Sequence, residues 1–366
     1  MECFYLRNRF RKTKNAAKVV LLTRIMGEHK KVNIKELSQL LNMSASTVSR
    51  ALRDSHEISE GTKKIVQEAA KKYNYTPNPY ASSLRKKNSK TIAIILPEVT
   101  DNYFSLVIKG AQSVAETLGY HVLIYLSHEK LETECKIIEA CTSGRVDGVL
   151  ISVTSETKDF AHFKQLQQEE IPIVSFDRVV EGFDVTKVIT NDFDSGYLAA
   201  QHLIDQGVKF PVFLTSSQHL HICQKRAAGF QKALLENGLT QHPQKHIIDC
   251  TEEPYQIIRN LLNQPDSPDG IVAAVERLAF QTYFVSQEIK REIPSALKVI
   301  AFSTLEIASL LNPSLTTITQ PAFETGKKGA ELLFKIIQKK SGVQWSNETI
   351  VLSSDLIERR STERTA

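Results

Sequence analysis

The chain has 366 residues, of which 42% are apolar and 24% charged, so it can bury a large core and hold two or three domains. No apolar run approaches the roughly 20 residues that span a bilayer, and VVLL at residues 19–22 is too short for a signal-peptide core, so we expect a cytoplasmic protein without a membrane partner. Residues 1–90 hold 20 Lys and Arg against 7 Asp and Glu, whereas the rest holds 26 against 34, so only the first quarter is a candidate for binding a polyanion.

Three short helices are predicted between residues 31 and 77. Capping residues and apolar spacing place them after Asn33, Ser44 and Ser59, with LeuAsnMet at residues 41–43 as the turn between the first two. The positions expected to face a shared core are Ile34, Leu37, Leu40, Leu41, Val48, Ala51, Leu52, Ile65, Val66, Ala69, Ala70 and Tyr73. Three compact helices of this kind predict a helix-turn-helix unit, whose second motif helix lies in the major groove of DNA.

The second of these helices is unusually rich in hydroxyl side chains, which are poor choices for a helix interior. At a helix N-terminus they suit contacts with DNA, because they are short and can donate to phosphate oxygens. We expect Ser44, Thr47 and Ser49 to contact phosphates and Ala45, Ser46 and Arg50 to contact base edges, with Arg50 able to pair with guanine through two hydrogen bonds. An ordinary Ser-rich turn is the alternative, but it does not explain the basic surroundings.

The stretch IKELSQLLNMSASTVSRALRDSHEISEGTKKIVQEAAKKYNYTPNPYASSLR, residues 34–85, resembles the DNA-binding head of the lactose-repressor/galactose-repressor (LacI/GalR) family of bacterial regulators. The resemblance implies that residues 78–85 form a hinge on operator DNA, with Leu84 inserted into the minor groove as a wedge. The alternative for Leu84 is packing on a neighbouring domain. We therefore expect a helix-turn-helix domain over residues 31–77 and a hinge and linker over residues 78–90.

Residues 1–30 form a basic extension that the resemblance does not cover. Heads of this family begin a few residues before the first helix, and Met26 followed by GEHKKVNIKEL would provide such a start. We expect either that translation begins at Met26 or that the extension is a disordered arm that adds phosphate contacts.

From residue 91 onward, apolar β-rich runs alternate with helix-length segments, which predicts parallel sheets covered on both faces. The predicted strands are TIAIILP, HVLIYL, DGVLISV, PIVSF, KVIT, PVFLT, DGIVAAV and LKVIAF. About 276 residues are too many for one open sheet and favour two similar lobes. The segment resembles the type I periplasmic-binding-protein fold that the same family carries as its effector domain, here residues 91–366. The expected class is thus α/β, with a three-helix head and a two-lobed effector domain.

Ligands of such sheets bind beyond the carboxyl ends of the strands. Four loops at such positions stand out: TDNYF at 100–104, FDR at 176–178, NDFDSG at 191–196 and QKRAAGF at 224–230, of which the first and the last match the family pattern. The effector-binding candidates are Asn102, Phe104, Asp177, Asp192 and Arg226, and the resemblance implies that Arg226 is the polar anchor. Each loop alone is a weak signal, and their order and spacing carry the prediction.

Two segments depart from the family pattern in the second lobe. AAVERLA places Val275 and Glu276 where the family has Asn and Asp, and AFSTLE places Ser303 where it has a ligand-binding Asp. The usual grip of two carboxylates on sugar hydroxyls is therefore expected to be missing there. Ser303 is expected to be a sixth effector-binding residue and to change the hydrogen bonding of the cleft.

These features predict a regulator, and in the first place a repressor, that binds double-stranded operator DNA as a homodimer and responds to a sugar or related metabolite. A solute-binding protein of a transporter is the alternative, opposed by the basic head and the missing signal peptide. We expect neither enzymatic activity nor a cofactor or metal, because no P-loop, GxSxG or HExxH is present. The five cysteines match no zinc or redox spacing. The tail lacks leucine heptads, which favours a dimer over a tetramer.

Overall fold

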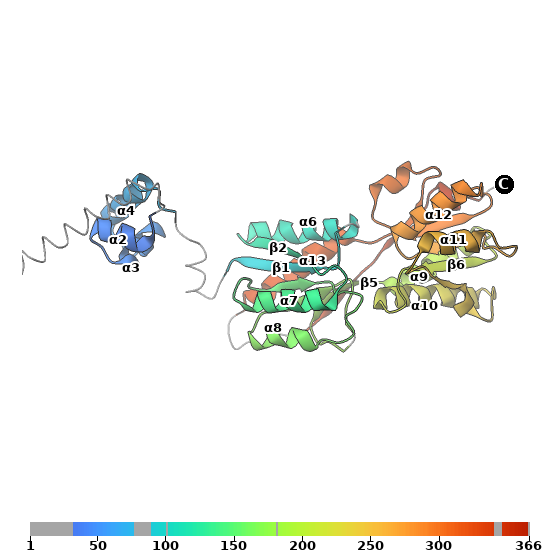
Figure 1. Ribbon diagram of the computed structural model, residues 1–366, viewed down its shortest axis with the longest axis horizontal. Coiled ribbons are helices and arrows are strands. Elements are labelled where there is room, and N and C mark those ends of the chain that lie inside the picture. Colours follow the sequence, from blue (N-terminus) through green and yellow to red (C-terminus); the bar gives the residue numbers. More distant parts are fainter. Residues whose placement is uncertain (1–31, 77–88, 100–101, 181, 340–345, 365–366) are drawn as a thin grey trace, which may run out of the picture. The chain divides into compact units, whose positions relative to one another are not determined.

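A computed structural model describes residues 32–76, 89–99, 102–180, 182–339 and 346–364 (Figure 1). The chain divides into two compact units, with the boundary between Arg85 and Lys86. Leu84, the predicted hinge at 78–85 and the extension at 1–30 lie outside the described residues, so the expectations about them stay predictions. No helix in the described ranges is long and apolar enough to cross a membrane.

The described residues of the first unit form three helices, α2 (Ile34–Leu41), α3 (Ala45–Leu52) and α4 (Glu60–Lys72), which enclose a small apolar core. Asn33, Ser44 and Ser59 cap them as the sequence predicts, and Asn33 with Glu36 forms a reciprocal capping box. The prediction for Ile65 was wrong, since its side chain is 51% exposed. Successive residues of a helix are rotated by about 100°, so when Val66 faces the core its neighbour Ile65 turns to solvent.

The first lobe of the second unit is built on a six-stranded parallel sheet in the order β11-β5-β4-β3-β1-β2. Its strands are β1 (Thr91–Leu96), β2 (His121–Leu126), β3 (Val149–Ile151), β4 (Ile173–Phe176), β5 (Thr186–Thr190) and β11 (Thr349–Leu352). Helices α6 (Asn102–Thr117) and α13 (Ala322–Ile337) pack on one face, and α7 (Leu131–Thr142) and α8 (Lys164–Gln168) pack on the other. Because alternate residues of β1 enter opposite cores, this strand is apolar throughout.

The second lobe repeats this plan with a sheet in the order β12-β10-β9-β8-β6-β7. Its strands are β6 (Pro211–Thr215), β7 (Ile247–Asp249), β8 (Gly270–Ala273), β9 (Lys298–Phe302), β10 (Thr316–Thr319) and the antiparallel edge strand β12 (Asp355–Ile357). Helices α9 (Asp192–Asp205) and α10 (His221–Glu236) cover one face, and α11 (Pro254–Leu262) and α12 (Glu276–Glu288) cover the other. The predicted pair of similar α/β lobes is confirmed.

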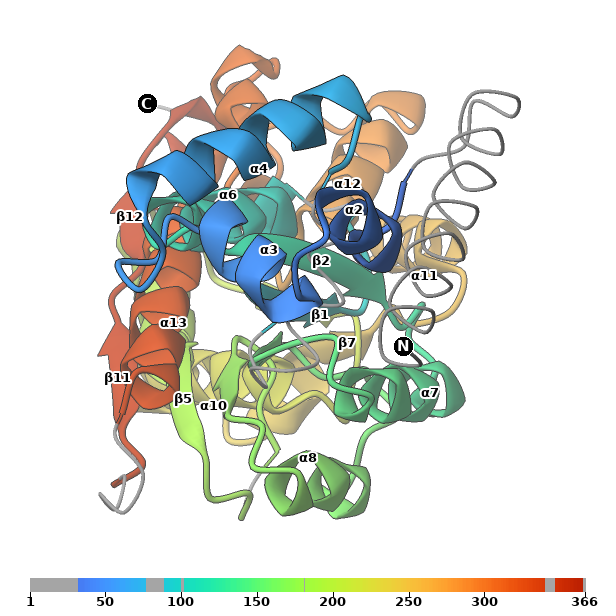
Figure 2. The same ribbon diagram turned by 90° about the vertical axis from the view of Figure 1, so that its left-hand side faces the viewer.

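The chain passes between the two lobes at three places: from β5 to α9, from β10 to α13, and from β11 to β12. The first and third passages are tied together, since the Asn191 side-chain oxygen accepts a hydrogen bond of 2.8 Å from the Ser354 backbone. β11 lies beside β5, and the two are seen together at one edge of Figure 2. Side chains at these passages therefore lie close to both lobes.

Glycines allow the helix pairs next to these passages to approach very closely. A Cβ atom added to Gly229 of α10 would lie 1.9 Å from the carbonyl oxygen of Phe193 in α9, and one added to Gly196 would lie 2.0 Å from that of Arg226. Gly110 of α6 and Gly326 of α13 make the equivalent contact in the first lobe. The glycine of the QKRAAGF motif is thus required by backbone packing, which in turn fixes the position of Arg226.

Candidate functional site

The predicted DNA-contacting residues other than Leu84 lie on and just before α3. Ser44, Ser46 and Arg50 are exposed, whereas Ala45, Thr47 and Ser49 are half-buried. The Ser44 hydroxyl accepts a hydrogen bond from the Thr47 backbone and lies 2.7 and 2.8 Å from the hydroxyls of Ser46 and Thr47. Ser44 therefore caps α3, and its hydroxyl also orders the hydroxyl groups of Ser46 and Thr47.

Arg50 forms an ion pair with Glu57 at 2.8 Å, in which the two side chains are 59% and 53% exposed. Such surface pairs contribute about 0–1 kcal/mol, so exchanging Glu57 for another hydrogen-bond acceptor costs little. The structure leaves Arg50 accessible for the base contact that the sequence predicts.

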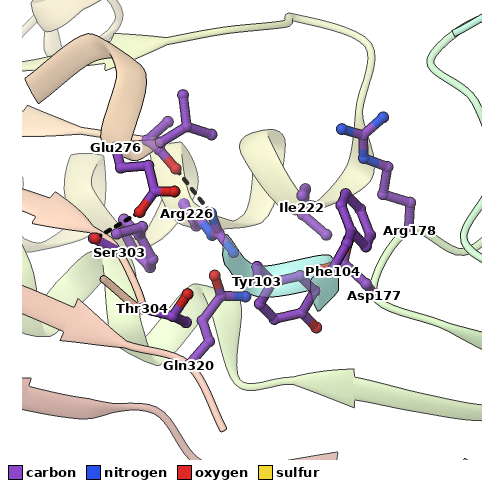
Figure 3. A pocket seen from close by; sticks show the side chains of 13 residues that line it. Tyr103, Phe104, Asp177, Arg178, Ile222, Arg226, Glu276, Ser303, Thr304 and Gln320 are labelled. Carbon is purple, nitrogen blue, oxygen red and sulfur yellow. Dashed lines mark hydrogen bonds between the residues drawn. The ribbon is translucent and has the colours of Figure 1, made fainter. Parts of the chain in front are cut away.

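The second unit has a pocket between its two lobes, at the carboxyl ends of their strands (Figure 3). We call it the interlobe pocket. The first lobe contributes Tyr103, Phe104, Asp177 and Arg178, the second contributes Ile222, Arg226, Ala274, Val275, Glu276, Phe302, Ser303 and Thr304, and Gln320 enters from a passage between them. Its volume of about 60 Å³ is far below the roughly 300–1,000 Å³ of ordinary ligand pockets. A ligand therefore requires either opening of the lobes or space beyond this pocket.

The structure brings four of the six predicted effector-binding residues to this pocket: Phe104, Asp177, Arg226 and Ser303. The other two, Asn102 and Asp192, do not line the pocket but contact residues that do. Asn102 donates a hydrogen bond of 3.0 Å across the lobes to the Thr304 carbonyl oxygen, and Asp192 pairs with Arg226. Asn102 thus stabilises the observed arrangement of the lobes, while Asp192 fixes the position of Arg226.

Arg226 is buried, with 2% of its side chain exposed, and is held on three sides. Its Nε donates to Asp192 at 2.7 Å, its Nη1 donates to the Ala274 carbonyl oxygen at 2.9 Å, and its guanidinium lies 4.1 Å from the centre of the Phe302 ring. Burial alone would lower the pKa of Arg226, but the attraction and hydrogen bond of Asp192, together with the attraction of Cys223 and Asp177, raise the pKa overall. Among the described residues its Nη2 has no hydrogen-bond partner, which leaves this NH2 group to donate to a ligand.

Glu276 supplies a carboxylate to the second-lobe side of the pocket. It begins α12 and accepts a hydrogen bond of 2.7 Å from the Ser303 hydroxyl (Figure 3). The second lobe therefore keeps one carboxylate, contributed from α12 and oriented by the serine that replaces the usual aspartate. Ser303 changes the hydrogen bonding of the cleft by holding this carboxylate.

Tyr103, Arg178 and Gln320 line the pocket without having been singled out in the sequence. The Gln320 side-chain nitrogen is buried without a partner among the described residues. Tyr103 and Arg178 adjoin residues that were predicted, so each motif pointed to the right loop. Gln320 lies in a passage between lobes, which only the sheet topology reveals.

Asp177 has both a strained backbone and an unfavourable charge. Its φ of 57° lies in the left-handed region, which Asn and Asp tolerate better than other residues with side chains. It is 6% exposed, and burial raises the pKa of its carboxyl group. Strain and a raised pKa at one position in a pocket are typical of functional residues.

We expect Asp177→Asn to stabilise the second unit at neutral pH while weakening ligand binding about 10-fold to 100-fold, the effect of losing a hydrogen bond to a charged group. Because the folded-state pKa is raised, the carboxyl contributes stability below its unfolded pKa and loses it as the pH rises. The gain from Asn should therefore be present at pH 7 and absent at pH 3.5. Urea unfolding of both proteins at the two pH values measures this gain in the free energy of unfolding. An equal gain at both pH values would contradict the raised pKa of Asp177 as its cause.

Two family models match the chain: the periplasmic binding proteins and sugar-binding domain of the LacI family over residues 89–354, and the bacterial regulatory proteins of the LacI family over residues 33–78. The ribose operon repressor of Halalkalibacterium halodurans is 29% identical over 310 residues, which cover 84% of this chain and 91% of that protein.

Solved structures agree with these matches. A LacI-family regulator from Enterococcus faecium with bound ribose is 26% identical, with a TM-score of 0.65 over 75% of this chain and 100% of that one. The lac repressor dimer bound to operator and an anti-inducer is 21% identical, with a TM-score of 0.77 over 91% and 99% of the two chains, and shows the shared fold.

Proposed function

Since this chain belongs to the LacI family of bacterial regulatory proteins, we propose that it is a transcriptional repressor whose affinity for operator DNA is set by a small ligand bound between two lobes. One observation carries the proposal: in the described part of the chain the interlobe pocket contains buried nitrogen donors on Arg226 and Gln320 without a hydrogen-bond partner, and the chain also has a helix-turn-helix unit. Buried donors without partners are costly, and a ligand oxygen would satisfy them.

For DNA we propose contacts from Ser44, Ala45, Ser46, Thr47, Ser49 and Arg50, within a domain of residues 31–77. The hinge and linker would be residues 78–90, with Leu84 as the wedge. The exposed face of α3 supports this assignment, because it combines a basic side chain with hydroxyls at a helix N-terminus.

For the effector we propose a ligand rich in hydroxyl groups. Asp177 and Glu276 face the pocket from opposite lobes and would accept from those hydroxyls, while Arg226 would donate to a ligand oxygen. Phe104 would pack against a ring. Ribose, named for two of the similar proteins, is the first sugar to test.

We propose that the chain acts as a homodimer. Large apolar side chains are exposed on β2 (Leu123 at 38% and Ile124 at 48%) and on α12 (Phe280 at 36% and Phe284 at 59%). A second copy would bury them, and the similar lac repressor is described as a dimer. We further propose that the protein is cytoplasmic and is not an enzyme, in line with relatives that are named as regulators.

We expect Arg50→Ala to lower discrimination at one base pair of the operator by about 1–3 kcal/mol, because it removes a two-pronged contact to a base. An operator selected from random duplex DNA and then varied base by base measures this in a binding titration. Lys35→Ala, an exposed position on α2, is the matched control and should leave the base preferences unchanged. An equal loss of affinity for specific and random DNA would remove Arg50 from the base-reading role.

A further inference from the structure

A second pocket adjoins the interlobe pocket through Arg178, which lines both. We call it the side pocket. Its volume is about 260 Å³. Its walls come from residues 153–155, 157–158 and 178–180 of the first lobe and residues 219–221 and 224 of the second. The interlobe pocket alone is too small for a sugar, so the side pocket offers a place for a second part of the same ligand.

The walls of the side pocket are basic. Lys158, Arg178, His219 and His221 line it, and no Asp or Glu is among the lining residues. Glu129 does not line the pocket, but it forms an ion pair with Arg178 Nη1 at 2.7 Å and so offsets part of the arginine charge. The Arg178 Nε is buried and has no partner among the described residues. Lys158 then leaves the pocket with a positive charge, and His219 and His221 add ring nitrogens that can hydrogen-bond to an anion.

Helix α10 adds to this potential. It begins at His221, and the residue before it, Leu220, makes no side-chain cap. The first N–H groups of a helix have no acceptor within the helix, and its N-terminus carries a partial positive charge that favours anions. The basic side chains and the uncapped helix therefore act on the same space.

We propose that the side pocket binds an anionic group of the effector, so that the natural ligand is a sugar carrying a phosphate ester or a carboxylate. Its hydroxyls would lie in the interlobe pocket and its anionic group beside Lys158 and Arg178. In Figure 3 the Arg178 guanidinium lies on the opposite side of the pocket from Ser303 and Glu276, which keeps the anionic group away from the second-lobe carboxylate. This inference rests on the proposed function, because it specifies the ligand of the same site.

Calorimetry on the full chain tests it with five probes: inorganic phosphate, ribose, ribose 5-phosphate, glucose 6-phosphate and gluconate. We expect inorganic phosphate to bind, and an anionic sugar to bind at least 10-fold more tightly than ribose. The phosphate esters and gluconate distinguish the two anionic groups. Lys158→Gln and His219→Gln should each remove most of this preference, while Lys164→Gln, an exposed lysine outside the pocket, should keep it.

The proposal is overturned if inorganic phosphate and the anionic sugars do not bind, if ribose binds as tightly as they do, or if both variants keep the preference. Measuring operator affinity with and without each ligand distinguishes a failure of this proposal from a failure of the proposed function. Ribose that binds and changes operator affinity would support the function and refute the side pocket. Anionic sugars that bind through Lys158 without changing operator affinity would support the side pocket and refute the function.

Discussion

Arg226→Ala is expected to lower the stability of the second unit by about 3–5 kcal/mol, because it leaves the Asp192 carboxylate buried without its partner. The same change removes the free Nη2 donor and the hydrogen bond to Ala274, so the response of operator binding to ligand should be lost. Urea unfolding followed by circular dichroism measures the first effect, and operator titration with and without ligand measures the second.

Two variants separate the role of Arg226 in folding from its role in binding. Arg226→Lys keeps the charge beside Asp192 and should recover most of the stability, but it cannot reproduce the planar fork and should not restore ligand binding. Lys225→Ala, an exposed neighbour on α10, is the control and should change neither. Normal ligand titration by Arg226→Lys would exclude the guanidinium as the anchor.

Gly229→Ala is expected to destabilise the second unit by about 3 kcal/mol, the upper part of the range for inserting a methyl group into a packed core. The added Cβ would lie 1.9 Å from the Phe193 carbonyl oxygen, and backbone on both helices leaves no flexible side chain to move aside. The separation of α9 and α10 must then increase, which also pulls Arg226 from Asp192. We therefore expect weaker ligand binding as well, measured by calorimetry on the folded variant.

Gly329→Ala provides the matched control for this steric argument. It adds the same methyl group to a buried helix of the same unit, but its nearest neighbour is the end of the Leu150 side chain at 3.2 Å rather than a backbone atom, so a shift of a few tenths of an ångström relieves the contact. We expect a change smaller than 1 kcal/mol, because alanine also favours the helix over glycine. Equal losses at the two glycines would show that the helix crossing is not the cause.

The sequence predicted the fold well where local signals and long-range packing agree. Caps at Asn33, Ser44 and Ser59 and the apolar runs of the inner strands each specify an element without reference to distant residues. The edge strand β12 could not be found in this way, because it is three residues long and half exposed and depends on pairing with β10. Ile65 was misplaced since an apolar residue next to a stripe is indistinguishable from a member of it.

The sequence predicted which loops form the candidate ligand site, but not which side chains of those loops contact one another or line the pocket. Residues after parallel strands were expected to converge, and Phe104, Asp177 and Arg226 do. Whether a side chain lines the pocket or supports another depends on distances between lobes, so Asp192 and Asn102 could not be separated from the lining residues in advance. The interaction between Glu276 and Ser303 joins positions 27 residues apart and required the three-dimensional structure.

We propose that occupation of the interlobe pocket changes operator affinity. The most direct test is a binding titration of the full chain on its selected operator, with and without a saturating sugar or sugar phosphate whose binding calorimetry has established. We expect at least a 5-fold change in affinity, the lower end of ordinary allosteric coupling, and none in Arg226→Lys. A ligand that binds in an Arg226-dependent manner and leaves operator affinity unchanged would contradict the claim.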